Sequence, residues 1–379
     1  MIFSAKATIQ ESRRSRFTQL YYSFHFILSI FDTMGINNLA VELIGQIIQP
    51  LCLYCTPEPR EDAGEDSDRR LNHAEKARFS SLASLCLVSR WLNATATPHL
   101  YHYLIDRNWP LLACTLLARA DLAQTVKALW FHHYSDADKS QSSPEVAAYF
   151  AKELQAYQDG VSDERRNEIR MWEMPDLANM FSTLYSTPLD MVASLCPNLE
   201  AVDITPAVYD LFIFNRPNSL PRLRAAAFRH WDTEGAIGPQ SLLPFFHAAP
   251  NLTTITFHRA NDYDGLAAPL AQLTHLDFRR SAFGAETLAG FLASCPRLES
   301  FKYECGGANV GYGQFTLAEA RDAVLARAAA SLALFRLSVA DDDVSVEEWE
   351  EAELLEMTRR LAERGIRFQF SWENMNGVE

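Results

Sequence analysis

Two cysteines separated by two residues, Cys52 and Cys55, are the first residues of this sequence whose types and spacing suggest chemistry. A Cys-x-x-Cys pair occurs in zinc sites and in redox-active dithiols. A zinc site needs further ligands, and His73 is the only candidate close by in the sequence. We therefore predict ordinary buried or loop cysteines at these positions, with no metal site and no cofactor.

Two further groups of residues could have a chemical role, but an ordinary loop is the favoured interpretation of both. His132 and His133 follow an apolar stretch, but no carboxylate stands at a catalytic spacing from them, so we expect histidines of a surface loop. The glycine-rich run over 306–313 lacks the Gly-Lys-Ser/Thr ending of a P-loop and the strand-turn-helix context of a dinucleotide site. It is expected to be a long loop, which could touch a partner.

The sequence does not contain the common patterns of enzyme active sites. It has no Gly-x-Ser-x-Gly, no His-Glu-x-x-His and no Cys/His spacing of a RING domain. The acidic stretches 341–343 and 347–353 are most simply a solvated face; the alternative is a surface that selects a basic segment of a substrate. We predict no catalytic residues and a protein that is not an enzyme.

Composition limits the class of protein and its partners. The chain has 379 residues, of which 48% are hydrophobic and 22% are charged, enough for one large core or two domains. The net charge of -14 repels phosphate backbones, so we expect no nucleic-acid partner. Seven scattered cysteines favour a reducing compartment over a disulfide framework, which indicates the cytoplasm or the nucleus.

The N-terminal stretch imitates a targeting signal. Arginines at 13, 14 and 16 precede an apolar run from Leu20 to Phe31, which is the order of a signal peptide. The run is too short to span a bilayer comfortably, and no small-x-small cleavage pattern follows it. We expect residues 1–33 to be a poorly ordered extension or an upstream mis-start, with a packed helix or a targeting signal as alternatives. No membrane partner is expected.

Two helices separated by an acidic loop are expected in the next part of the chain. Apolar residues at helical spacing predict a short helix over 38–49, which Pro50 ends. Residues 56–78 are polar and acidic, and contain proline and glycine, so a solvated loop is expected there. Helical periodicity resumes at Phe79 and runs to about Thr95, since the following Thr97-Pro98 favours a helix end.

The stretch from Leu82 to Tyr101, LASLCLVSRWLNATATPHLY, carries a family resemblance. It resembles the second half of an F-box, and residues 39–44 resemble the opening helix of that family, with Ala40 where proline is usual. The resemblance covers 38–101, about a sixth of the chain. It implies a three-helix module over 34–105 that docks the Skp-family adaptor of a cullin-based ubiquitin ligase.

A module of this size cannot bury all of its apolar residues internally, so some remain available to cover a partner. Docking through residues at positions i, i+3 and i+4 of a helix is the expected mode. The predicted adaptor-binding residues are large apolar residues of the two helices and a proline corner: Leu39, Leu43, Ile44, Leu85, Val88, Trp91 and Pro98.

A different periodicity begins at Val126. The pattern Leu-x-x-φ-x-φ, in which φ is apolar, recurs with leading leucines at 199, 223, 252, 273, 298 and 332, so the intervals are 24, 29, 21, 25 and 34 residues. Val126 opens an earlier copy, and Ile366–Phe370 looks like a closing strand. Alternating apolar positions suit a half-buried strand, and such intervals are typical of a leucine-rich-repeat solenoid, here without a regular asparagine ladder.

Helices are expected between these strands. Residues 109–120, 240–249 and 285–294 have helical apolar spacing, and an acidic helix is expected over 341–360. Residues 144–190 interrupt the periodicity and are expected to form an inserted helical arm. The predicted fold class is α/β, with an N-terminal three-helix F-box followed by an irregular leucine-rich-repeat solenoid over 106–379.

Taken together, these features resemble the fungal F-box proteins with degenerate repeats. The resemblance implies a substrate-recognition subunit of an SCF-type cullin-RING ubiquitin ligase. Its module would bind the adaptor and through it a cullin, while the repeats would bind a protein substrate at residues that the sequence does not identify. The alternatives are a repeat-type interaction scaffold without ligase association, and an enzyme with an unrecognised site in the 144–190 arm or the 306–313 loop.

Overall fold

The computed structural model describes residues 41–56, 73–105, 109–132, 144–159, 186–205, 218–230, 237–238, 242–260, 270–305, 315–328, 330–339 and 351–372. Several predictions fall outside these residues: the extension over 1–33, the docking residue Leu39, the middle of the acidic loop and the glycine-rich run over 306–313.

The chain divides into two compact units, Met1–Leu100 and Tyr101–Glu379. The sequence placed this boundary slightly later, at the end of a module over 34–105. The difference arises from β1 (Tyr103–Ile105), a strand of the second unit that pairs in parallel with β2 (Ala128–His132). Three residues are too few for an alternating pattern to be detected, so only the long-range pairing identifies this strand.

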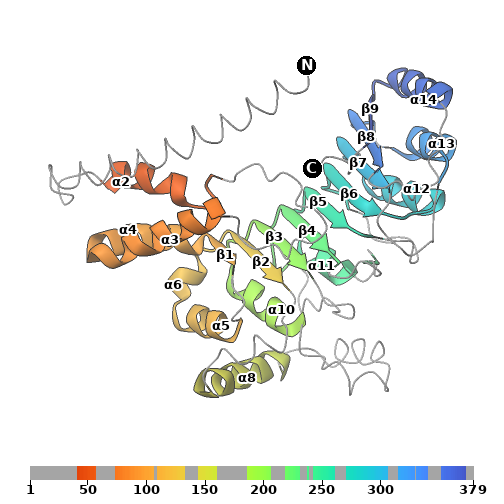
Figure 1. The fold of residues 1–379 in the computed structure, drawn as a ribbon. Coiled ribbons are helices and arrows are strands. Elements are labelled where there is room, and N and C mark those ends of the chain that lie inside the picture. The colour runs from red at the N-terminus through yellow and green to blue at the C-terminus, as the bar shows by residue number, and fades with distance from the viewer. Residues whose placement is uncertain are drawn as a thin grey trace. The chain divides into compact units, whose positions relative to one another are not determined.

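Helices make up the described part of the first unit (Figure 1). They are α2 (Val41–Ile48), the 3-10 turn η2 (Gln49–Leu51), α3 (His73–Val88) and α4 (Arg90–Tyr101). One residue per helical turn points inward and builds a small core: Ile44, Ile48, Leu82, Leu85, Leu92 and Ala96.

The sequence predicted one helix from Phe79 to Thr95, whereas the structure contains two. The first begins at His73, so the end of the predicted solvated loop is helical and its Arg78 is buried. Ser89 separates α3 from α4, and its Oγ accepts a hydrogen bond from the N–H of Leu92 at 3.1 Å, as an N-cap does. Pro98 does not end α4, because its neighbours Ala96 and Leu100 pack on the core and outweigh the missing donor.

The second unit is built on a parallel sheet that has nine strands among the described residues, in sequential order from β1 to β9 (Figure 1). Each strand pairs with the next strand along the chain. After β1 and β2 come β3 (Ala201–Thr205), β4 (Ala225–Arg229), β5 (Thr254–His258), β6 (His275–Ser281), β7 (Ser300–Cys305), β8 (Leu334–Val339) and β9 (Arg367–Trp372).

All the strands predicted from the Leu-x-x-φ-x-φ pattern are confirmed, and the pattern also sets their register. The last φ positions of successive copies stand opposite each other and are buried: Ile204, Phe228, Phe257, Phe278, Tyr303 and Leu337. Equal register places the same face of every strand inward, because side chains alternate with a period of two. The core of this unit is therefore a continuous row of aromatic and aliphatic side chains along one face of the sheet.

Helices border the sheet: α5 (Trp109–Ala118), α6 (Ala120–Ala123), α8 (Pro144–Asp159), α10 (Ser186–Leu195), α11 (Leu243–Ala248), α12 (Ala285–Ser294), α13 (Leu317–Arg327) and α14 (Glu351–Ala362). The predicted arm contributes α8, which packs on α5 and α10. The sequence prediction missed α13, although Thr316 and Glu319 form a capping box at its start. None of the described helices is long and apolar enough to cross a membrane.

Two asparagines link consecutive turns of the second unit. Asn198 Nδ2 donates to the carbonyl of Gln124 at 2.6 Å, and Asn251 Nδ2 donates to the carbonyl of Pro221 at 2.8 Å. Each asparagine stands just before the leading leucine of its copy and reaches back to the previous turn.

Candidate functional site

The first unit exposes large apolar side chains at the end of α3 and on α2. Leu87 is 87% exposed, Val88 is 67% exposed and Leu43 is 49% exposed. We call these three residues the apolar trio. Single exposed apolar residues are common on soluble proteins, but two consecutive ones at a helix end, Leu87 and Val88, present apolar area that a partner could cover.

The corner between α3 and α4 holds Leu87 and Val88 in place. The side chain of Asn93 donates from Nδ2 to the carbonyl of Cys86 at 2.8 Å, which satisfies one of the last carbonyls of α3. The N-cap of Ser89 starts α4 immediately afterwards. The end of α3 and the start of α4 are therefore both hydrogen-bonded. These bonds hold the backbone that carries Leu87 and Val88.

The predicted docking residues divide into exposed and buried ones. Leu43 and Val88 are exposed, as docking requires, whereas Ile44 is fully buried and Leu85 is 7% exposed. Both buried residues belong to the core of the first unit, so we withdraw them from the docking set. Helical spacing alone cannot tell the inner residues of a face from those at its margin.

The remaining predicted docking residues have intermediate positions. Trp91 is partly buried and packs on the core, and Pro98 is partly buried within α4. Leu39 lies outside the described residues. The sequence prediction missed Leu87, the most exposed of the large apolar residues that the structure describes. It could have been found, because it adjoins Val88 in the stretch that resembles an F-box.

A second group of side chains meets where the turn after η2 lies against the end of α4. Cys52, Cys55 and His99 bring one ligand atom each within 4.8 Å of the others. Cys55 Sγ lies 3.8 Å from Nδ1 of His99, and the backbone N–H of Cys55 donates to Cys52 Sγ at 3.4 Å. The prediction from the sequence considered only His73 as a ligand beside the cysteine pair. It missed His99 because 44 residues separate this histidine from Cys55.

Burial changes the acidity of these groups. Desolvation, with added effects from Cys52, raises the pKa of the Cys55 thiol from 9.0 to about 12. Desolvation also lowers the pKa of His99 from 6.5. In the absence of a bound cation, the charged forms of both side chains are therefore disfavoured.

The cysteines at the strand entries of the second unit are protected thiols. Burial raises the pKa of Cys196 and of Cys295 from 9.0 to about 12. Because the thiolate is the nucleophile, we expect neither to be alkylated by iodoacetamide in the folded chain, even at a pH somewhat above 9.0. Cys86, which is partly exposed, should react under the same conditions.

Peptide mass spectrometry after short labelling, with a urea-unfolded sample as the reference, measures this contrast. The prediction has a pH limit, because the folded-state pKa of both thiols is raised. Protection should be complete below 9.0 and should be lost as the pH rises toward 12. Equal labelling of Cys86 and Cys196 at pH 8 would contradict the buried position of Cys196.

The other face of the sheet carries charged side chains between the buried positions. Arg229 donates from Nε to Asp203 at 3.0 Å, and its Nη1 lies 2.7 Å from Nε2 of His258. Farther along the sheet, Lys302 and Arg336 stand opposite each other in register. Lys302 also stands opposite Asp277 of β6, so this row of the sheet carries charges of both signs.

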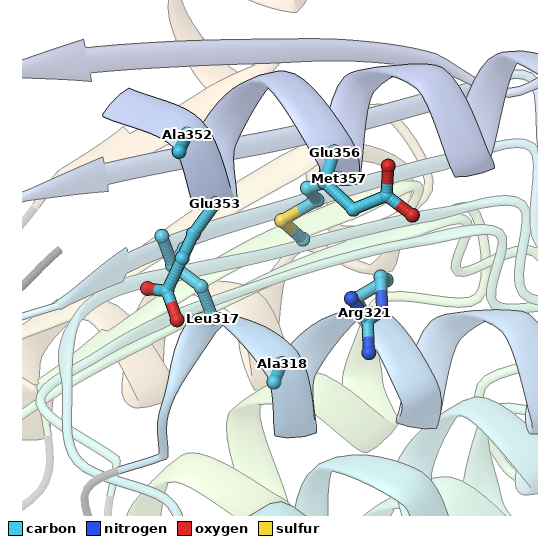
Figure 2. A pocket seen from close by; sticks show the side chains of 7 residues that line it. All are labelled: Leu317, Ala318, Arg321, Ala352, Glu353, Glu356 and Met357. Atoms are coloured by element: carbon cyan, nitrogen blue, oxygen red, sulfur yellow. The ribbon is translucent and has the colours of Figure 1, made fainter. Parts of the chain in front are cut away.

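A hollow of about 210 Å³ lies between α13 and α14 (Figure 2). Leu317 and Met357 line it with apolar atoms, while Arg321 and Glu356 approach it from opposite helices. The lining residues include no cysteine, histidine, serine or threonine. Its titratable lining residues are Arg321, Glu353 and Glu356.

The other places where the sequence left chemistry open are only partly described. His132 is the last described residue of β2, and His133 lies outside the described residues together with 160–185 and 306–314. No family model, curated protein or solved structure matches this chain.

Proposed function

We propose that this protein is the substrate-recognition subunit of an SCF-type cullin-RING ubiquitin ligase. The exposed apolar trio carries the proposal, because it coincides with the stretch that resembles an F-box and leaves apolar area to be covered. In this proposal the trio contacts the Skp-family adaptor, and the adaptor joins the chain to a cullin.

The second unit would bind the protein to be modified. A parallel sheet whose strands follow in chain order, with recurring buried positions, supports the interpretation as irregular leucine-rich repeats. The charged face of that sheet is the proposed surface for the target. The chain would hold its target near the enzyme that carries ubiquitin and would raise the effective concentration of the reacting groups. It would perform no bond chemistry of its own.

Binding of a purified Skp-family adaptor to the full chain tests the proposal. We expect the double variant Leu43→Asp, Val88→Asp to bind at least about 30-fold more weakly than wild type, because each substitution places a carboxylate in an apolar contact. Isothermal titration calorimetry measures the affinity, and circular dichroism checks that the variant is folded.

A matched control separates docking from a general effect of added charge. Leu355→Asp changes an equally apolar side chain, 64% exposed, on α14 of the second unit, and it should leave adaptor binding unchanged. Wild-type affinity in a folded double variant would exclude the trio as the docking surface. Absence of adaptor binding by the wild-type chain would instead favour the alternative of an interaction scaffold without ligase association.

A further inference from the structure

We propose that Cys52, Cys55 and His99 hold a structural zinc ion in the first unit. All three residues belong to that unit, and their ligand atoms lie within 4.8 Å of one another. The inference does not depend on adaptor docking, because it rests on the geometry of these side chains alone.

The distances suit a single metal ion. Two ligands of a tetrahedral zinc ion, one sulfur and one nitrogen, are separated by about 3.6 Å, which follows from Zn–S and Zn–N bonds of about 2.3 and 2.0–2.1 Å. Cys55 Sγ and His99 Nδ1 are already 3.8 Å apart. Small shifts of side chains would therefore place every ligand atom at bonding distance from a common centre.

The turn that carries the cysteines is arranged as a metal-binding turn requires. The N–H of Cys55 points at Cys52 Sγ, and such N–H donors stabilise a metal-bound thiolate. From α3, the buried guanidinium of Arg78 donates through Nη2 to the carbonyls of Cys52 and Thr56, at 2.8 and 2.7 Å. This arginine joins both ends of the turn and so holds its backbone in place.

The ion would have a structural role in the first unit. The described residues of that unit have an apolar core of six buried side chains, and a bound metal would add to the stability that this core supplies. Zinc would join the turn after η2 to the end of α4 across 44 residues of chain. Binding free energy of a structural zinc ion contributes directly to folding, and the two thiol protons pass to solvent.

The ligand types favour zinc over other cations. Thiolate sulfur and imidazole nitrogen are soft or borderline ligands, which select zinc over magnesium or calcium. The competing interpretation is a redox-active pair in which Cys52 and Cys55 form a disulfide. The contribution of His99 favours the metal, since a dithiol does not require a histidine ligand opposite it.

Reconstitution of the full chain tests the site. The reduced, metal-free chain is incubated with zinc under anaerobic conditions, and unbound metal is then removed. Elemental mass spectrometry measures the amount of zinc bound per chain. We expect about one zinc per chain in wild type and in Cys86→Ser, a control that removes a neighbouring thiol outside the group. Cys55→Ser and His99→Gln should bind zinc about 100-fold or more weakly.

X-ray absorption at the zinc edge on the wild-type chain identifies the ligands without any variant. Two sulfurs at about 2.3 Å together with nitrogen at about 2.0 Å are expected. The proposal is overturned if the reduced wild-type chain binds no zinc, if the absorption spectrum shows no sulfur ligands, or if Cys55→Ser and His99→Gln retain wild-type affinity. A Cys52–Cys55 disulfide that forms in place of zinc binding would assign the pair to redox chemistry.

Discussion

Replacing Phe278 by alanine should destabilise the second unit by about 3–5 kcal/mol, because it removes a large buried side chain and leaves a cavity. The ring of Phe278 is fully buried and stacks on Phe257, with ring centroids 5.1 Å apart. Phe283 and Phe291 meet it edge-on at 4.7 and 5.1 Å, so its neighbours come from the preceding strand β5, from the segment after β6 and from helix α12. Urea unfolding of the full chain, followed by circular dichroism, measures the loss.

Phe368 provides the matched comparison for this prediction. It lies on the last strand, is only partly buried, and contacts Phe335 at 5.6 Å. Phe368→Ala should cost about 1–2 kcal/mol, in proportion to the smaller apolar area that it buries. If both substitutions lowered stability equally, the continuous aromatic row would not be the main core of the second unit.

Replacing Tyr303 by phenylalanine should cost about 2–4 kcal/mol, although it removes only one oxygen atom. The hydroxyl of Tyr303 donates to the carbonyl of Ser281 at 2.9 Å and accepts from the N–H of Phe283 at 3.0 Å. All three residues are buried, so the substitution leaves a donor and an acceptor without a partner, at about 1–3 kcal/mol each. The same unfolding experiment measures the change.

Ser331→Ala is the control for Tyr303→Phe. Its hydroxyl also donates to a backbone carbonyl, that of Leu298 at 2.9 Å, but Ser331 is exposed and water can replace it. The expected loss is below about 1 kcal/mol. A small loss for Tyr303→Phe as well would mean that water reaches Ser281 and Phe283 and that this part of β6 is less tightly packed.

The strands of the second unit could be predicted because each copy of the pattern contains all the information that its strand needs. Leucine, two spacers and two alternating apolar residues decide which face turns inward, as at Leu273, Leu276 and Phe278. Helix α13 and strand β1 were missed for opposite reasons. The capping box at Thr316 was present but not used, whereas β1 is recognised only by its pairing with β2.

The candidate sites were predictable only in part. The sequence singled out the stretch proposed for docking, and Leu43 and Val88 of its candidate residues are exposed, but it could not separate them from the buried Ile44 and Leu85. One apolar helix face holds both kinds of residue, and exposure depends on what packs against that face. Leu87 was overlooked at the same corner.

By itself, the sequence determined the local elements: a helical first part, an α/β second part and the register of the strands. These follow from the spacing of apolar residues, which acts over a few positions along the chain. Only the tertiary structure decided which helix residues stay exposed and that Cys52, Cys55 and His99 meet. Both outcomes depend on contacts between residues far apart in the sequence, and no local periodicity records such contacts.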